Sequence, residues 1–280
     1  MRNLLIASDL SSRSQAALGR ALALAEAGTG ETRLSVLHVA DDAGPDDGAG
    51  PELRVQAFGR QDNRPDLALI RRHGDPDAVI AQVAHELGAA LVLMGVPRPR
   101  RFPDALSGTT AERVLNDSAL PVAVIRNPPE QPWRRILIAL EDDDGAIPLV
   151  AAAEALDLFA GADVTVLSAT NLPGPQQLRT TGLSEIYLQT LDMHATEERG
   201  QALRRRLRDH FQGVNRLDFA LRHGAPGQAI LDLQANEGFD LVIMGARGRG
   251  RLARRLLGST SAEMIRLLDT DLICLPSPHP

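Results

Sequence analysis

Short apolar runs alternate with longer amphipathic segments along the whole chain. Continuous apolar runs of this length are typical of buried parallel strands, and apolar residues at helical spacing predict helices. In the first part of the chain the predicted strands are Asn3–Ser8, Arg33–Val39, Asp66–Arg72, Ala90–Gly95 and Val122–Arg126. The predicted helices are Ser12–Ala27, Pro76–Leu87 and a segment that begins at Gly108. This alternation predicts an α/β fold with a doubly wound parallel sheet, which binds ligands at the carboxyl ends of its strands.

The same pattern is present twice. Three segments recur with one constant offset: "RHGDPDAVI" from Arg72 and "RHGAPGQAI" from Arg222, "LVLMG" ending at Gly95 and "LVIMG" ending at Gly245, and "LSGTT" from Leu106 and "LLGST" from Leu256. The Pro-rich segment Arg126–Trp133 has the composition of a linker between the two copies. We therefore expect two tandem domains, at residues 1–127 and 133–277.

The two copies differ in their middle regions. Gly182–Phe211 in the second copy reads as one long helix. The first copy has "DDAGPDDGAGPELR" at Asp41–Arg54, a run of turn-forming residues. The first copy is therefore expected to have lost or shortened this helix.

Composition narrows the classes of function. The chain contains no lysine, which excludes a P-loop lysine, a Schiff-base lysine and a lysine general base. Its single cysteine, Cys274, excludes an intrachain disulfide and a cysteine-based zinc cluster, and its place in an apolar strand predicts a buried side chain. No metal site is predicted.

Charge and hydropathy bear on location and partners. The net charge of −6 gives no overall attraction to nucleic acid or anionic lipid. The N-terminus leads directly into an apolar strand, and no apolar run approaches the roughly 20 residues that span a bilayer. We therefore expect a cytoplasmic protein with no nucleic-acid or membrane partner. A protein partner or a homodimer remains open.

The segment "GARGRGRLARRLLGST", Gly245–Thr260, carries the strongest candidate chemistry. Gly245 ends a predicted strand, where a Cβ would block the close approach of a ligand, and Gly248 lets the backbone turn with its N–H groups facing inward. Gly258 opens a helix whose free N–H groups and dipole favour an anion. The loop adds five positive charges, on Arg247, Arg249, Arg251, Arg254 and Arg255. These features predict a polyphosphate site, and a solvated Arg-rich loop with a helix cap is the alternative.

This arrangement resembles the universal stress proteins. The spacing Gly-x2-Gly-x9-Gly-Ser is similar to the nucleotide-binding motif of that family, and the likeness extends over nearly the whole chain as two tandem units. It includes "IASDLS" after the first strand, "HV" at His38-Val39, the Gly-x-Pro before the third helix and the "MG" that ends the fourth strand. The resemblance implies a five-stranded, Rossmann-like parallel sandwich of the adenine nucleotide alpha hydrolase type in each half. It also implies that the halves pack as a pseudo-two-fold dimer, and that ATP or another adenine nucleotide is the ligand in some members and absent from others.

The first half departs from the family motif in its phosphate loop. By resemblance, the nucleotide-binding positions of this half are Asp9, Val39, Gly95, Gly108 and Thr109. Arg98 replaces the second glycine of the motif, although its side chain could still meet a phosphate. Pro97, Pro99 and Pro103 remove N–H donors that a phosphate cradle needs. The first site is therefore expected to be degenerate.

The second half has a complete phosphate loop. By resemblance, its nucleotide-binding positions are Glu141, Gly245, Arg247, Gly248, Gly258, Ser259 and Thr260. Glu141 replaces the aspartate equivalent to Asp9 and begins the acidic run Glu141–Asp144. This run could recruit Mg²⁺ beside phosphates, form an acidic turn at a helix start, or repel a nucleotide. We predict one functional adenine-nucleotide site, in the second half.

Three classes of function follow from these residues. The first is a nucleotide-binding stress or signalling protein, in which a slow ATPase activity is the most that the residues allow, since they form no catalytic constellation. The second is an ATP pyrophosphatase or nucleotidyl transferase, but the loops "SDLSSR" and "EDDDGA" contain neither a Ser-Gly-Gly-x-Asp-Ser nor a His-x-Gly-His motif. The third is a scaffold that binds no nucleotide. The resemblance favours the first.

Overall fold

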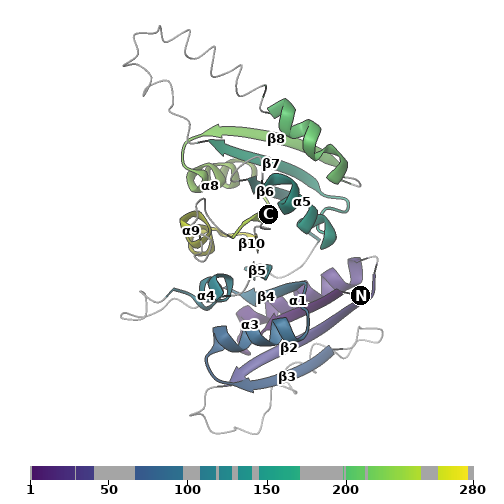
Figure 1. Ribbon diagram of the computed structural model, residues 1–280, viewed down its shortest axis with the longest axis vertical. Coiled ribbons are helices and arrows are strands. Elements are labelled where there is room, and N and C mark those ends of the chain that lie inside the picture. Colours follow the sequence, from purple (N-terminus) through teal and green to yellow (C-terminus); the bar gives the residue numbers. More distant parts are fainter. Residues whose placement is uncertain are drawn as a thin grey trace.

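The computed structural model describes residues 2–28, 30–40, 67–96, 108–117, 120–127, 132–140, 145–170, 198, 200–211, 214–246 and 258–276. These residues form one ten-stranded sheet with helices on both of its faces (Figure 1). The two halves of the chain lie at opposite ends of this sheet (Figure 1).

The first half supplies one end of the sheet. Its strands are β1 (Arg2–Ala7), β2 (Thr32–Ala40), β3 (Leu67–His73), β4 (Leu91–Gly95) and β5 (Val122–Ile125). Its helices are α1 (Ser12–Ala27), α3 (Pro76–Glu86) and α4 (Thr110–Asp117). Each of them corresponds to an element predicted from the hydrophobic pattern, and α1 has the predicted bounds.

The second half repeats this order. Its strands are β6 (Arg135–Leu140), β7 (Asp163–Thr170), β8 (Arg216–His223), β9 (Leu241–Gly245) and β10 (Asp271–Leu275). Its helices are α5 (Ala146–Ala155), α8 (Pro226–Glu237) and α9 (Ser259–Leu267). Pro226 occupies the first turn of α8 as Pro76 does in α3, where its missing N–H has no intrahelical acceptor to lose.

The long helix predicted over Gly182–Phe211 is described only in part. Residues 200–207 are α-helical, and a short 3-10 helix, η3 (Arg208–His210), follows them. Phe211 is not helical, so the predicted end lies one residue too far along the chain. The remainder of the predicted helix and the segment Asp41–Arg54 lie outside the described residues.

The strand order shows two copies of one doubly wound unit. Along the sheet the order is β3-β2-β1-β4-β5-β10-β9-β6-β7-β8. Within each half every pairing is parallel, while β5 and β10 pair antiparallel at the centre. The predicted pair of five-stranded parallel sandwiches is therefore confirmed.

The central β5–β10 pairing is self-complementary. Ala123 faces Ile273, which is its counterpart in the other copy, and Val122 faces Cys274 while Val124 faces Leu272. An isologous contact of this kind is the one that a two-fold axis generates between identical subunits. The two halves are thus related by a pseudo-two-fold axis at the β5–β10 seam.

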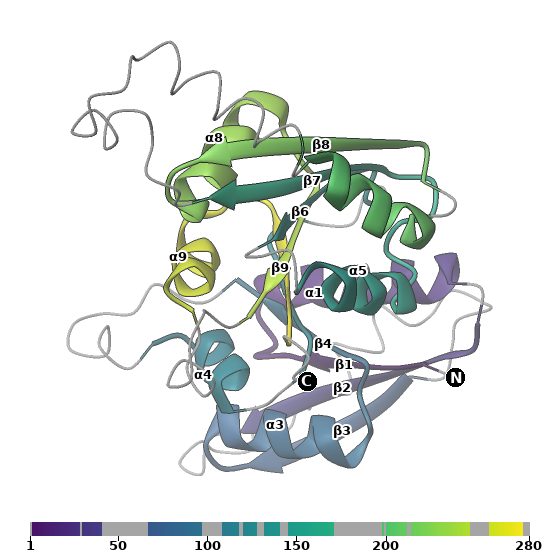
Figure 2. The same ribbon diagram turned by 45° about the horizontal axis from the view of Figure 1, so that its top comes forward.

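The hydrophobic core is continuous across both halves. Alternate strand residues point to opposite faces of the sheet, so Leu4 and Ile6 belong to one layer and Leu5 to the other. The first layer lies under α1 and α5, and the second lies under α3, α4, α8 and α9 (Figure 2). Each layer contains buried residues from both halves. Separating the halves would therefore expose apolar surface on both faces of the sheet.

Cys274 lies in β10 and is fully buried, as the sequence predicts. Burial raises the pKa of its thiol to about 12, and the charge of Arg126 only partly opposes this shift. Because the thiolate is the reactive species, we expect the folded protein to resist alkylation by iodoacetamide at a mildly alkaline pH of about 8. Labelling should appear only after unfolding in urea, as measured by intact mass. Rapid modification of the native protein would contradict this assignment.

Candidate functional site

The predicted nucleotide-binding residues of the first half gather at the carboxyl edge of the sheet. Asp9 follows β1, Val39 lies near the end of β2 and Gly95 ends β4. Parallel pairing of β1 with β2 and with β4 brings these three strand ends together. The described residues thus occupy the edge where a doubly wound sheet binds its ligands.

Asp9 organises the turn between β1 and α1. Its Oδ1 accepts hydrogen bonds from the backbone N–H of Ser11 at 3.1 Å and from the Ser11 hydroxyl at 2.5 Å. Between them, Leu10 has a φ of 60°, an uncommon conformation for a bulky residue. The side chain of Asp9 is exposed at this edge and carries a structural role in the turn.

Gly95 lies so close to the backbone of α1 that a larger residue would not fit there. A Cβ at this position would lie 2.6 Å from the carbonyl oxygen of Arg13 and 2.9 Å from the backbone nitrogen of Ser14. The first turn of α1 therefore packs directly on the end of β4. In the first half this close packing of the helix is itself sufficient to require a glycine at the strand end, and the assignment of Gly95 to a nucleotide site stays a prediction.

The start of α4 is closed by a capping box. The carboxylate Oε2 of Glu112 accepts the backbone N–H of Thr109 at 2.6 Å, and the Thr109 hydroxyl accepts the N–H of Glu112 at 3.2 Å. Gly108 has a φ of 73°, and a Cβ there would lie 2.9 Å from Glu112 Oε2. Gly108 and Thr109 keep the spacing of the phosphate motif. In this structure, however, the group beside them is the carboxylate of Glu112.

Two further ion pairs surround this capped helix start. The second carboxylate oxygen of Glu112, Oε1, accepts Arg266 Nε of α9 at 2.8 Å. Arg113 donates from Nε to Asp77 at the start of α3 at 2.7 Å and from Nη1 to the Gly108 carbonyl at 3.2 Å. Both Glu112 and Asp77 are buried. The polar groups at this end of α4 are thus bonded to one another.

The second half presents a different helix start. The backbone N–H of Gly258 donates to the Ala246 carbonyl at 3.1 Å, and the Ser261 hydroxyl donates to the Gly245 carbonyl at 2.9 Å. These contacts hold the end of β9 against the first turn of α9. The two ends of the predicted phosphate loop therefore meet, as a strand–loop–helix phosphate site requires.

No side chain caps the first turn of α9 within the described part of the chain. Gly258 is the N-cap, with φ −60° and ψ 146°, and Ser259 and Thr260 follow as the first two helical residues. The position equivalent to Glu112 is Ala262, which carries no acceptor. Glu141, Arg247 and Gly248 lie outside the described residues, so the site rests on Gly245, Gly258, Ser259 and Thr260.

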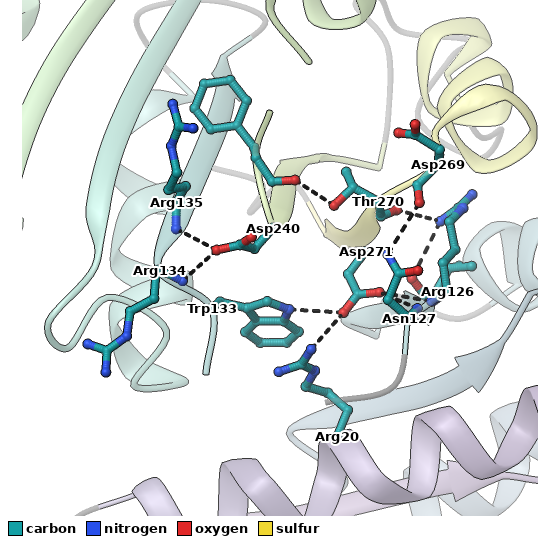
Figure 3. Close-up of polar contacts among 12 residues, drawn as sticks. Arg20, Arg126, Asn127, Trp133, Arg134, Arg135, Asp240, Asp269, Thr270 and Asp271 are labelled. Atoms are coloured by element: carbon teal, nitrogen blue, oxygen red, sulfur yellow. Dashed lines mark hydrogen bonds and ion pairs between the residues drawn. The ribbon is translucent and has the colours of Figure 1, made fainter. Parts of the chain in front are cut away.

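A buried polar network joins the halves where β5 ends and the antiparallel β10 begins (Figure 3). Asp271 accepts the Trp133 indole N–H at 2.9 Å and the backbone N–H of Arg126 at 2.8 Å, and it lies 3.4 Å from the guanidinium of Arg20. The Arg20 guanidinium also stacks over the Trp133 ring, 4.6 Å from its centroid. Burial lowers the pKa of Arg20, and the charge of Asp271 opposes this shift.

Arg126 links this network to α9. Its guanidinium donates to the Ile265 carbonyl at 2.6 Å, in the last turn of α9, and to the Thr270 carbonyl at 3.1 Å. A cation at a helix C-terminus stabilises the free carbonyls and the helix dipole. The first half thus holds the C-terminal end of the helix whose N-terminal end is the candidate phosphate site.

A pocket of about 590 Å³ lies beside the network, at the starts of β6, β9 and β10. Trp133, Arg134, Asp240 and Asp271 are among its lining residues. Asp240 accepts the backbone N–H groups of Arg134 and Arg135 at 2.8 and 2.9 Å (Figure 3). The candidate residues of the second half, Gly245 and Gly258, lie at the opposite, carboxyl ends of these strands. The pocket is therefore a feature of the junction and separate from the candidate nucleotide site.

Two influential residues were missed by the sequence analysis. Glu112 could have been found, because Thr109-x-x-Glu112 is a readable capping-box signature. Asp271 is visible in the sequence only as an unexplained departure from Pro121 of the first copy. Its partners come from α1, from the end of β5 and from the linker. They are distant from Asp271 in the sequence, so no local pattern predicts these contacts.

Among the residues that the structure describes, no group of three or more His, Cys, Asp or Glu side chains is arranged to hold a metal ion. None of the helices that these residues form combines the length and apolar character needed to cross a membrane.

The chain matches the model of the "Universal stress protein family" twice, at residues 1–126 and at residues 132–276. A protein of Thermus aquaticus described as "Universal stress protein in QAH/OAS sulfhydrylase 3'region" is 32% identical over 133 residues, which cover 48% of this chain and 91% of that protein. The two family matches account for nearly the entire sequence and coincide with the two structural copies.

Solved structures share the whole tandem arrangement. A universal stress protein from Archaeoglobus fulgidus superimposes with a TM-score of 0.66 at 20% identity, covering 98% of this chain and 96% of its own. A functionally unknown protein from Pseudomonas aeruginosa gives a TM-score of 0.62 at 18% identity, covering 99% and 93%. At these identities the likeness concerns the fold.

Proposed function

This chain belongs to the universal stress protein family, and on that basis we propose that it binds an adenine nucleotide, ATP or a close relative, at the start of α9 in its second half. Binding would change the surface around the phosphate loop and thereby act in a stress response or in signalling. The observation that carries the proposal is the uncapped first turn of α9, held against the end of β9.

The residues at this position suit a polyphosphate. The N–H groups of Ser259 and Thr260 belong to the first turn of α9, where they have no carbonyl partner within the helix. Their alignment with the helix dipole favours negative charge. The two hydroxyl groups add donors at the same place. Gly245 and Gly258 bring the backbone of the strand and the helix close together on either side of the loop.

The first half is less suited to the same ligand. The N–H of Thr109 is already bonded to the Glu112 carboxylate, and this buried carboxylate places negative charge where a phosphate would have to lie. The prediction of one site in the second half therefore gains support from a contact that lies outside the glycine motif.

Counting the nucleotide is the first test. The protein would be purified without added nucleotide, and any released nucleotide identified by chromatography and mass after denaturation. Protein found empty would then be titrated with ATP by calorimetry. We expect about one adenine nucleotide per chain. A protein that is empty and also fails to bind added ATP would refute the proposal and favour a scaffold that works through its surfaces alone.

A matched pair of proline variants tests which half binds. Proline is tolerated at the first helical position, where it removes one N–H donor without breaking the helix. Ser259→Pro should remove a donor worth about 1.5 to 3 kcal/mol to a charged acceptor, and so weaken ATP binding about tenfold or more. Thr110→Pro makes the same change at the start of α4 and should leave the affinity within about twofold. The reverse pattern would assign the site to the first half.

A further inference from the structure

The two helix starts differ at one decisive position. In the first half, Glu112 places a carboxylate on the N-terminal backbone of α4. In the second half, Ala262 stands at the equivalent position of α9 and leaves that turn without a side-chain cap. The surrounding sequences, "LSGTTAE" and "LLGSTSA", are otherwise close copies.

The position of the Glu112 carboxylate is the one that an anionic ligand would take. Anions at helix N-termini bind to free backbone N–H groups, and Oε2 of Glu112 accepts such a group from Thr109 at 2.6 Å. The carboxylate also lies close to where a Cβ of Gly108 would be, 2.9 Å away. Glu112 as a residue is only 3% exposed, so this negative charge is withdrawn from solvent.

The second half fixes this carboxylate in place. Arg266 of α9 donates to Glu112 Oε1 at 2.8 Å, and α4 and α9 lie next to each other on one face of the sheet (Figure 2). A buried carboxylate without such a partner would carry a desolvation penalty. The pair is asymmetric, because the positions equivalent to Arg266 and Glu112 are Asn116 and Ala262, whose side chains carry no charge.

We infer that Glu112 is a built-in anion that fills the phosphate position of the first half, and that the residue pair Glu112 and Ala262 decides which half of the chain accepts a phosphate. Arg266 is a positioning residue that holds this internal anion from the other half. The inference rests on the proposed function for the second half. It explains the expected lack of phosphate binding in the first half by the Glu112 side chain as well as by the sequence of the phosphate loop.

The first experiment needs no nucleotide. Glu112→Ala leaves the amides at the start of α4 and the Arg266 guanidinium without their carboxylate, so inorganic phosphate should bind there. We expect the Tm of this variant to rise with phosphate, at constant ionic strength, by several degrees more than the Tm of the wild-type chain. Glu112→Gln keeps an acceptor of the same size and should show no such gain. Equal phosphate responses in all three proteins would overturn the inference.

The second experiment transfers the internal anion to the second half. Ala262→Glu places a carboxylate at the position equivalent to Glu112, beside the first turn of α9, and should weaken ATP binding about tenfold or more by competing with the phosphate for that turn. Ala262→Gln adds the same bulk without charge and should bind ATP about tenfold more tightly than Ala262→Glu. Folded Ala262→Glu protein with wild-type affinity would refute the inference. A wild-type chain that binds no ATP would instead refute the proposed function, and the phosphate experiment would still decide the role of Glu112.

Discussion

Replacing Asp271 with alanine is expected to lower the free energy of unfolding by about 3 to 5 kcal/mol, the usual range for removing one partner of a buried ion pair. The side chains of Asp271 and Arg20 are 1% and 6% exposed, so the remaining guanidinium could not be hydrated without local unfolding. The indole N–H of Trp133 and the backbone N–H of Arg126 would lose their acceptor as well. Each buried donor left without a partner adds about 1 to 3 kcal/mol, although such contributions are not additive.

Urea unfolding followed by fluorescence measures this loss directly. Trp133 is the only tryptophan of the chain and lies within the network, so its emission reports on the junction itself. Asp218→Ala is the matched control: its carboxylate pairs with Arg216 at 2.7 Å, but both side chains are more than half exposed. The control should change stability by less than about 0.5 kcal/mol. A loss below about 1 kcal/mol for Asp271→Ala would contradict the role of this carboxylate in joining the halves.

The architecture could be predicted from the sequence because it depends on local patterns of residues. The apolar runs of the parallel strands, the prolines in the first turns of α3 and α8 and the repeated segments each depend on neighbouring residues only. Alternation of these elements leaves few topologies open, since parallel crossovers are right-handed and connections are short. The tandem repetition then predicts the two halves and their common strand order.

The candidate site could be predicted only in part. Glycine spacing located the start of α9, but the same spacing at Gly108 belongs to a helix start that is capped by Glu112. The Thr109–Glu112 box is a local signal, whereas the contact of Glu112 with Arg266 exists only because the pseudo-two-fold axis brings α4 to α9. The Asp271 network depends on the same axis. Residues that act across the seam have partners that no local sequence pattern reveals.

Expressed separately, the two halves are expected to self-associate rather than to remain folded monomers. We propose residues 1–127 and 133–277 as these halves. Separation would uncover the β5 and β10 edges and the two core layers that they share, and a free sheet edge with an apolar surface is a template for pairing. It would also break the bond from Arg2 Nη1 to the Leu156 carbonyl at 2.6 Å and the bonds from Arg126 to α9.

The expected product for residues 133–277 is a homodimer in which β10 pairs with its own copy. The β5–β10 register is already the one that a two-fold axis produces, so β10 can present the same edge to another β10. Size-exclusion chromatography with light scattering gives the mass, and the intact chain at equal concentration is the control. Mixing the two halves should convert the homodimer into a one-to-one complex, because the ion pair of Arg20 with Asp271 and that of Glu112 with Arg266 form only between unlike halves. A folded, monomeric fragment would show that the shared core contributes little, and that each half is stable without the seam.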